Sequence, residues 1–513
     1  MSRAKTVAFG WIFAGTLAGL GGWLVVSPMP ARAQTPGNNA VYNTSGIVTS
    51  SAAFIDASAV TQGSDICATL FSIISSTNYP GHAAVIDARG ISNTTGSPNM
   101  LTCNSGSPWT QGNGQRTNSN TTTNPATILL PAGTIYISTS WILPNFAQVA
   151  GEGKAATVIK ACSTGTAGCS ANFAPPAWDN SWPGGPANGV NAMVELGSPF
   201  GTTGSCGQTC FCPGGLGSTD CNSVGVRDFT LDGAGQNING IVNQVSQELT
   251  FVDDVALNNI EGIGLWIGND ANPDAVTSVG AIEAGNSGPY SNLVFNAGTG
   301  ALSTTECVNL QAGTRGVHGM SCTANGTPAA AIYLDGSNNS IEDVQITGFQ
   351  DGVLIGSQAL STLATNFRNN LLLNIGAISG VTNVVHICGP NPPNGSAACA
   401  ETNNPAADLT IVGASNLGVI SASITTIRDD ETETALADAS VAMYVLGEQT
   451  PNGSTTQYTR FTTSPRLPSW ATGNVAITAN SACTGNGSLY SRDVASTGTV
   501  LWACVNSVWT PIR

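Results

Sequence analysis

The sequence predicts an all-β solenoid, in which the chain coils over itself and short parallel strands stack between successive coils. In residues 128–153 (ILLPAGTIYISTSWILPNFAQVAGEG), apolar strand-like stretches end in turns, and no helix signal separates them. A second observation is a repeat of the form Asp or Asn, apolar, any residue, apolar. It begins at Asp228, Asp254, Asn292, Asp343, Asn370 and Asp408. Most repeats are followed by a strand that opens with Gly, as in NGIVNQV and DGVLIGS.

Residues 84–430 carry this pattern and are predicted to form the solenoid domain. One coil cannot bury its own inward row of Val, Ile and Leu, whereas stacked coils can. The repeats at Asp228 and Asp254 begin 26 residues apart, and those at Asp343 and Asn370 begin 27 apart. Asn accepts the left-handed backbone of sharp corners, and its amides can form ladders between layers. We expect this of the Asn doublets at 258–259, 338–339 and 369–370.

Residues 1–33 have the pattern of a secretory signal peptide. Two basic residues in MSRAK precede the apolar run TVAFGWIFAGTLAGLGGWLVV, and Ala31-Arg32-Ala33 supplies a small-residue ending. We therefore expect cleavage after Ala33 and a secreted, periplasmic or cell-surface protein that has no membrane contact once cleaved. A retained N-terminal anchor is the alternative, because the apolar run is long for a signal peptide.

Residues 34–83 are predicted to be a leader that contains one helix. The stretch SDICATLFSIISS at 64–76 has amphipathic spacing, and Ser64 stands at the N-cap position. A helix ahead of a solenoid can cover the first coil, which would otherwise present an open edge. We predict that this helix caps the solenoid.

The end of the chain has a different pattern. Residues 431–475 are predicted to be a linker with a strand-like extension. Residues 476–513 are predicted to form a small β module, because Gly-rich turns separate short strands there. Trp502 and Trp509 either fill the core of this module or remain partly exposed, and a unit of this size needs large aromatic side chains to bury area.

The 14 cysteines indicate disulfides, because their number is even and export is predicted. Proximity in sequence predicts four pairs: Cys162/Cys169, Cys307/Cys322, Cys388/Cys399 and Cys483/Cys504, the last clamping the C-terminal module. A tight group could instead bind zinc, although disulfides fit an exported chain without a nearby His better. This group is Cys206, Cys210, Cys212 and Cys221.

Composition excludes some partners. Charged residues make up 9% of the chain, and the net charge is −15. Nucleic acids and anionic membrane surfaces require a basic patch, so neither is an expected partner. No cofactor is expected; calcium is the cation that so acidic a surface could hold, although no dense acidic loop is present.

The run AVIDARGI, followed by ILLPAGTIYISTSWILPNFAQVAGEGKAATVIKA and the repeats, resembles the pectate-lyase-like superfamily of secreted proteins. The resemblance is to the branch with rhamnogalacturonase- and epimerase-like domains, and it covers roughly residues 84–430. It implies a right-handed single-stranded parallel β-helix whose outer face holds a polysaccharide, with hydrolase, lyase or epimerase chemistry. Hydrolases of the superfamily use clustered aspartates, and its lyases use a basic residue, often with calcium.

Three carboxylates are the first catalytic candidates: Asp232, Asp253 and Asp254. Adjacent acids can share one proton and serve as acid and base. The alternative is structural for Asp254, because the repeat places it in the corner column, where Asp caps backbone amides. The chain also lacks the Asn-Thr-Asp and Gly-His-Gly of polygalacturonases, offering TLDG at 230–233 and GVHG at 316–319.

Strand alternation predicts a second kind of site. If Ile263, Leu265 and Ile267 point inward, Trp266 points outward, and the same reasoning turns His318 and Tyr333 outward. These three side chains could form a row that stacks on sugar rings. His318 would act as general base and Arg315 as a carboxylate clamp. Alternatively, long insertions such as residues 268–290 cover this face.

Three functions fit these observations. The first is a secreted enzyme that acts on a pectin-like or other acidic polysaccharide. The second is a non-catalytic glycan-binding, adhesive or structural solenoid, which the missing catalytic motifs favour. The third is a depolymerase like those of phage tailspikes, against which the predicted signal peptide argues.

Overall fold

The computed structural model describes most of residues 54–388 and shorter stretches within 409–446 and 489–512. The predicted signal peptide, most of the predicted leader and most of the predicted linker lie outside the described residues, so these boundaries stay predictions. No helix in the described part of the chain has both the length and the apolar character that crossing a membrane requires.

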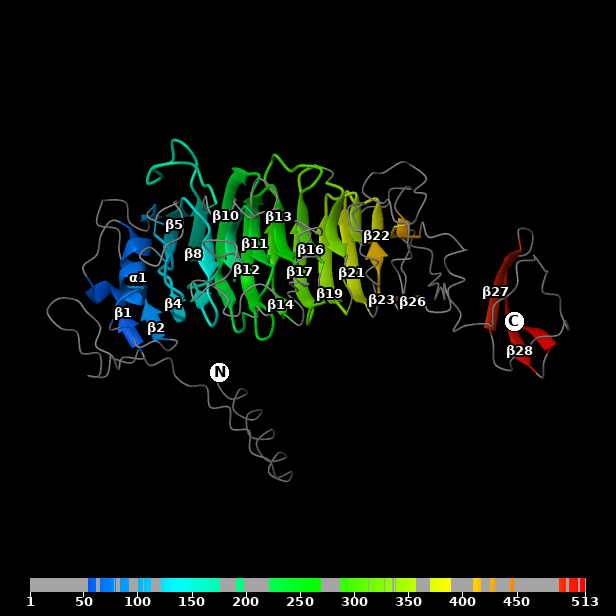
Figure 1. The fold of residues 1–513 in the computed structure, drawn as a ribbon. Helices are drawn as coiled ribbons and strands as arrows, with labels where there is room; N and C mark the ends of the chain where they lie inside the picture. Colours follow the sequence, from blue (N-terminus) through cyan, green and yellow to red (C-terminus); the bar gives the residue numbers. More distant parts are fainter. Residues whose placement is uncertain are drawn as a thin grey trace, which may run out of the picture. The chain divides into compact units, whose positions relative to one another are not determined.

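The described residues of the solenoid form two parallel sheets, and the chain passes from one to the other in each coil (Figure 1). The larger sheet has seventeen strands. They are β1 (Phe54–Asp56), β2 (Ala84–Asp87), β3 (Met100–Cys103), β4 (Ala126–Leu129), β5 (Gly133–Ile137), β7 (Gln148–Ala150), β8 (Thr157–Ala161), β10 (Gly225–Gln236), β12 (Phe251–Ile260), β14 (Tyr290–Ser291), β15 (Val294–Asn296), β17 (Val317–Thr323), β19 (Ser340–Thr347), β21 (Leu371–Ser379), β23 (Leu409–Val412), β24 (Ser415–Asn416) and β26 (Met443–Leu446).

The smaller parallel sheet has nine strands among the described residues, and its order follows the chain from β6 to β25. They are β6 (Trp141–Leu143), β9 (Ala192–Leu196), β11 (Asn239–Asn243), β13 (Ile263–Ile267), β16 (Glu306–Leu310), β18 (Ala330–Leu334), β20 (Asp351–Ile355), β22 (Asn383–Ile387) and β25 (Thr425–Asp429). Both sheets are parallel throughout, which confirms the predicted parallel β-helix.

The C-terminal residues form a separate sheet. Three antiparallel strands lie within the segment predicted as a small β module: β27 (Leu489–Val494), β28 (Gly498–Val505) and β29 (Val508–Ile512). The side-chain surroundings of Trp502 and Trp509 lie outside what is described of this module, so their place in its core stays a prediction.

The core of the β-helix is a stack of inward apolar side chains. In one column, Leu231 of β10 pairs in register with Leu257 of β12, and Phe295 and Cys322 continue the column in the next coils. All four are essentially fully buried. Burying one such side chain contributes roughly 1.5–3 kcal/mol, and the contribution recurs in every coil.

A capping helix covers the first coils, as predicted. Helix α1 (Ile66–Ile74) contacts β3, and a 3-10 turn, η1 (Ala57–Ala59), lies beside it (Figure 1). The expected N-cap is wrong by one residue: Asp65, not Ser64, caps the helix, and its Oδ1 accepts the Ala68 N–H at 2.9 Å. Asp65 is the better cap because its other carboxylate oxygen also accepts the Asn104 N–H, at 2.7 Å.

Left-handed corners run along the seventeen-stranded sheet where the repeat predicts them. Their Asp and Asn residues have φ between 52° and 62°: Asp228, Asp254, Asn292, Asp343 and Asn374. The expected corner at Asn370 is wrong, because Asn374 occupies it. Asn370 is buried instead, and its Oδ1 accepts the Asn339 N–H at 3.0 Å. The side-chain amides of this pair form the predicted ladder, while Asp408 lies outside the described residues.

Two predicted disulfides are confirmed, Cys162–Cys169 and Cys307–Cys322. Cys221 is also disulfide-bonded, which favours a disulfide over zinc at this position. Its partner lies outside the described residues. The remaining members of the tight group, Cys206, Cys210 and Cys212, lie outside them too, so their roles stay predictions.

The other two predicted disulfides are not confirmed. The three disulfides whose partners are both described include neither Cys399 nor Cys504. Cys388 is disulfide-bonded, but Cys399 lies outside the described residues, so the bond between Cys388 and Cys399 stays a prediction.

Cys504 differs from Cys399 in that its backbone is described. Cys504 lies in β28, opposite Trp509 in the strand register, but nothing is described of its side chain. Its expected partner, Cys483, lies outside the described residues. The clamp between Cys483 and Cys504 is therefore not confirmed, and the described part of the module consists of paired strands alone.

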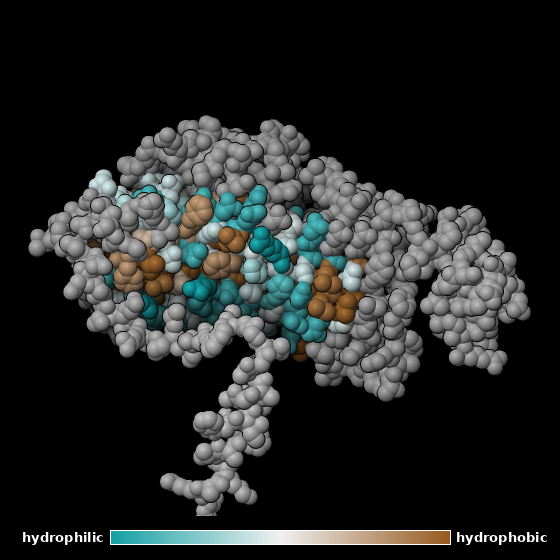
Figure 2. All heavy atoms as spheres, turned by 90° about the horizontal axis from the view of Figure 1, so that it is seen from below, coloured by the Kyte–Doolittle hydropathy of each residue, from teal (hydrophilic) through white to brown (hydrophobic). Residues whose placement is uncertain are grey.

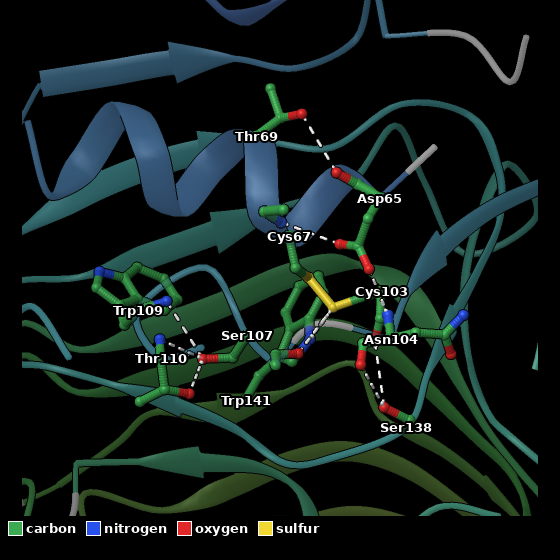
Figure 3. The surroundings of a disulfide bond; sticks show 12 residues. Asp65, Cys67, Thr69, Cys103, Asn104, Ser107, Trp109, Thr110, Ser138 and Trp141 are labelled. Carbon is green, nitrogen blue, oxygen red and sulfur yellow. Dashed lines mark hydrogen bonds between the residues drawn. A yellow bond between two sulfur atoms is a disulfide. The ribbon is translucent and has the colours of Figure 1, made fainter. Parts of the chain in front are cut away.

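A further disulfide, Cys67–Cys103, was missed by sequence proximity because it joins residues 36 apart (Figure 3). It ties α1 to the end of β3. The Trp141 Nε1 lies 3.3 Å from the Cys103 Sγ, and Trp141 is fully buried. The bond therefore fastens the cap directly onto the apolar stack.

We expect the double substitution Cys67→Ser/Cys103→Ser to lower the free energy of unfolding by about 4 kcal/mol, because the bond closes a long loop in the unfolded chain. Denaturant unfolding monitored by Trp fluorescence measures this. The matched control is Cys162→Ser/Cys169→Ser, whose seven-residue separation predicts a loss of about 2 kcal/mol. An equal or larger loss in the control contradicts the prediction.

Candidate functional site

The three predicted catalytic aspartates lie on the seventeen-stranded sheet and do not converge. Asp254 stands at a left-handed corner, where the Lys154 Nζ lies 2.6 Å from its Oδ1. Asp253 accepts hydrogen bonds from the Ser291 hydroxyl at 2.6 Å and from the Asn292 amide at 2.9 Å. Asp253 thus joins its coil to the next one, and Asp254 joins its coil to one two coils earlier. These contacts fit the structural alternative.

Asp232 lies farther along its strand. The Lys160 Nζ lies 2.6 Å from its Oδ2, and its Oδ1 accepts the Ala234 N–H and the Asn259 amide. In the strand register it stands beside Asn258, whereas Asp253 stands beside Arg227. The two carboxylates are therefore five residues apart along the strands, too far to share a proton.

His318 does share a column with Asp253. Asp253 pairs in register with Ser291, Ser291 with His318, and His318 with Glu342. The His318 Nδ1 lies 3.3 Å from a Glu342 oxygen, and both side chains are about one-third exposed. Arg315 precedes this strand, and its N–H donates to the Ser287 carbonyl.

An open groove of about 350 Å³ lies on this sheet, next to the Lys154–Asp254 pair. Polar and apolar groups contribute about equally to its lining, and the polar residues include Asn292, Asp343 and Gln345. Nearly every polar group named here already has a protein partner. The groove offers a surface for weak binding rather than a reactive centre.

The expected row of Trp266, His318 and Tyr333 does not form. Trp266 and Tyr333 belong to the nine-stranded sheet, whereas His318 belongs to the other. Tyr333 is only 1% exposed, so the expectation that it faces solvent is wrong; the alternative of a covered face describes it. Trp266 is half-buried, and its Nε1–H donates to the Gln311 Oε1 at 2.9 Å.

The outward face of the nine-stranded sheet instead buries ionisable side chains. One outward column runs through Glu195, Val242, Trp266, Asn309, Tyr333, Leu354 and His386. A second outward column contains Glu306, Ala330, Asp351 and Asn383. Buried titratable groups that face one another are more frequent at functional sites than elsewhere. We refer to these two columns as the buried polar face.

Glu306 is the most perturbed carboxyl on the buried polar face. Burial raises its pKa to about 8, against the hydrogen bond from the Asn309 amide at 2.7 Å, which lowers it. The group is therefore largely protonated at neutral pH. The Oδ1 of Asn309 is buried and has no hydrogen-bond partner among the described residues, so it remains able to accept a proton donor from a ligand.

Asp351 and His386 form a close pair on the same face. The His386 Nδ1 lies 2.6 Å from the Asp351 Oδ2, and both side chains are nearly fully buried. The Asn383 amide donates to the other Asp351 oxygen at 2.6 Å. A carboxylate that holds Nδ1 fixes the orientation of the imidazole ring.

Strand register sets the distance between these groups. Glu306 and Asp351 lie in one column with Ala330 between them. Adjacent strands are about 4.8 Å apart, so their Cα atoms are separated by about 10 Å. His386 lies one coil further from Glu306, on β22, and its ring contacts Asp351. The protonated carboxyl and the oriented imidazole are therefore held on one face by strands three coils apart.

Sequence reasoning missed Glu306, Asp351 and His386. The available signal was a polar residue within an otherwise apolar second strand, as in ECVNL, DGVLI and NVVHI. Strict alternation turns His386 outward, but it would turn Glu306 and Asp351 inward with Val308 and Val353. It also does not show that the outward face is covered. Burial is what makes these groups chemically unusual.

One group of three residues in the described part of the chain has metal-ligand spacing: Asp65, Cys67 and Cys103. Its two sulfurs are bonded to each other, so they are unavailable to a metal (Figure 3). The described residues therefore give no support to a bound metal.

No protein-family model matches the sequence, and no curated protein matches it. Among solved structures, the A-module of mannuronan C-5 epimerase AlgE4 from Azotobacter vinelandii is similar at 12% identity, covering 63% of this chain and 86% of that one, with a TM-score of 0.28. A 1,3-α-1,4-β-D-galactose-4-sulfate-3,6-anhydro-D-galactose-2-sulfate 4 galactohydrolase is similar at 9% identity (57% and 63% covered, TM-score 0.29). Geobacillus virus E2 ORF18 is similar at 11% identity (65% and 61% covered, TM-score 0.21). At these identities and TM-scores the likenesses carry no information on activity or substrate.

We expect the stability of the protein to fall as the pH rises from 4.5 to about 8. The folded state keeps the Glu306 proton up to about pH 8, whereas the unfolded chain releases it near pH 4.5. The folded state thus binds more protons in this window, and stability is lost on the order of 4 kcal/mol across it. Urea unfolding at several pH values measures the slope. Glu306→Gln should flatten it, and Glu342→Gln should not; an unchanged slope in Glu306→Gln contradicts the assignment.

Proposed function

We propose that this protein is a secreted enzyme of the pectate-lyase-like superfamily that cleaves glycosidic bonds in a polysaccharide, at the buried polar face. The observation that carries the proposal is the presence of a protonated carboxyl, Glu306, on the same sheet face as the oriented Asp351–His386 pair. Proton donors and acceptors held in such separate environments serve as acid and base pairs in catalysis.

Glu306 acts as general acid. At neutral pH it holds a proton, and the Asn309 amide fixes the oxygen that does not carry it. Its proton passes to the oxygen of the departing sugar, which would otherwise leave as an alkoxide. General acid catalysis of this kind contributes roughly 10²–10⁴ in rate.

His386 acts as general base, and Asp351 is its positioning residue. With its ring oriented by Asp351, His386 takes a proton from water for hydrolysis or from a carbon beside a carboxylate for elimination. Both reactions break the same bond, and they differ in product: hydrolysis gives a reducing end only, whereas elimination also gives a double bond. Glu306 and Asp351 expose only 7% and 5% of their surfaces, so the proposal includes opening of this face to admit the polymer.

The second candidate is a non-catalytic glycan-binding solenoid. The open groove beside Lys154 and Asp254 favours it, because that surface is accessible and lined by hydrogen-bonding groups. Binding of polysaccharide without any turnover would support this function instead.

We expect Glu306→Gln and His386→Asn each to lower kcat by at least roughly a hundredfold while the fold is kept. The assay measures reducing ends and unsaturated products on polygalacturonate, rhamnogalacturonan, alginate and xylan. In the wild type, kcat should fall above about pH 8, where Glu306 loses its proton.

Asp254→Asn is the matched control, because it changes an exposed carboxylate of the other sheet and should leave kcat unchanged. The proposal fails if folded wild-type protein gives no product from any polymer. It also fails if Glu306→Gln retains full activity.

A further inference from the structure

Two large apolar residues adopt a backbone conformation that suits neither of them. Phe146 and Leu249 have φ of 60° and 59°, in the left-handed region where Asn, Asp and Gly are at ease and bulky apolar residues are outliers. Their side chains are nonetheless 49% and 62% exposed. Neither burial nor backbone preference accounts for an apolar residue at these corners.

The two residues belong to one column of corners. Gln148 pairs in register with Gly225, and Gly225 with Phe251, which places Phe146, Ser223 and Leu249 in successive coils. Ser223 also has a left-handed φ, of 57°. The backbone holds the column firmly: the Phe146 N–H donates to the Asn222 carbonyl, and the Ser223 N–H to the Glu248 carbonyl.

A third apolar side chain extends the surface beside this column. Phe251 is half-buried, and its ring lies over Gly225, where a Cβ would meet ring atoms at 2.3–2.6 Å. Phe146, Phe251 and Leu249 are defined here as the apolar corner. Exposed apolar areas on this protein are separated by polar ones, as Figure 2 shows for one face.

The position of the apolar corner connects it to the nine-stranded sheet. Phe146 lies three residues after the end of β6, and Leu249 lies in the connection that follows β11. Both therefore stand where the chain leaves that sheet, in coils that precede Glu306. Glu306 is the first residue of β16, so it lies at the opposite edge of the nine-stranded sheet from the apolar corner.

We infer that the apolar corner is a binding subsite for sugar rings of a linear polysaccharide. Phe146 and Leu249 lie two coils apart, about 10 Å, a spacing comparable to a disaccharide unit. The C–H faces of sugar rings stack on aromatic and aliphatic side chains. A chain with 9% charged residues has few ionic contacts to offer, so stacking and hydrogen bonds are its means of holding a polymer. Backbone strain retained at an exposed position is consistent with a functional demand.

This inference rests on the proposed function for its ligand class only, and binding is measured apart from cleavage. Glu306→Gln serves as the background, and affinity electrophoresis in gels containing polygalacturonate, rhamnogalacturonan, alginate or xylan gives the dissociation constant. We expect Phe146→Asn/Leu249→Asn to weaken binding at least tenfold. Its melting temperature should be unchanged or higher, because Asn accepts the left-handed backbone.

Ser223→Asn is the matched control in the same column and should bind as the background does. Unchanged affinity in the double variant overturns the inference, as does a lowered melting temperature, which would make these residues structural. Binding to phosphatidylcholine vesicles instead of any polysaccharide also overturns it. If Glu306→Gln keeps full activity while the double variant loses affinity, the proposed function fails and the subsite stands.

Discussion

The stacking of inward aliphatic side chains between parallel coils is the interaction on which the rest of this structure depends. A coil has too few residues to enclose a core, so Leu231 is buried only because Leu257 lies directly beside it in the next coil. This requirement fixes the register, since a slip of one residue would turn every apolar side chain outward. The cap follows from the same requirement, because the first coil needs cover that no earlier coil supplies.

A fixed register also aligns everything that points away from the core. Residues at equivalent positions recur about 4.8 Å apart, so outward side chains meet in columns instead of in loops. Two columns have contrasting outcomes. On the larger sheet, Asp253 accepts hydrogen bonds from the next coil, Asp254 forms an ion pair with Lys154, and both carboxylates remain partly exposed. On the smaller sheet, Glu306 and Asp351 lie out of water, and burial raises the pKa of Glu306.

Periodicity in the sequence predicts the parallel solenoid, the corner aspartates and two local disulfides, because each depends on residues close together in the chain or on inward alternation. It does not reveal which sheet a strand joins. His318 and Trp266 both follow an opening Gly, yet they lie in different sheets. The predicted aromatic row therefore combines residues that lie on two different faces. The burial of Tyr333 and Glu306 depends on what covers the outer face. The Cys67–Cys103 bond depends on where a distant helix docks. Alternation of apolar and polar residues predicts neither of these features.

The corners show how the same constraint makes exceptions informative. Most left-handed corners carry Asn, Asp or Gly, for which this conformation costs little. Several of the Asn and Asp side chains at these corners also form hydrogen bonds to a neighbouring coil. Phe146 and Leu249 bond to nothing through their side chains and gain little burial. Asn at both positions would suit the backbone and would leave the apolar stack unchanged. We attribute their presence to contact with a ligand outside the chain, the sugar rings of the proposed subsite.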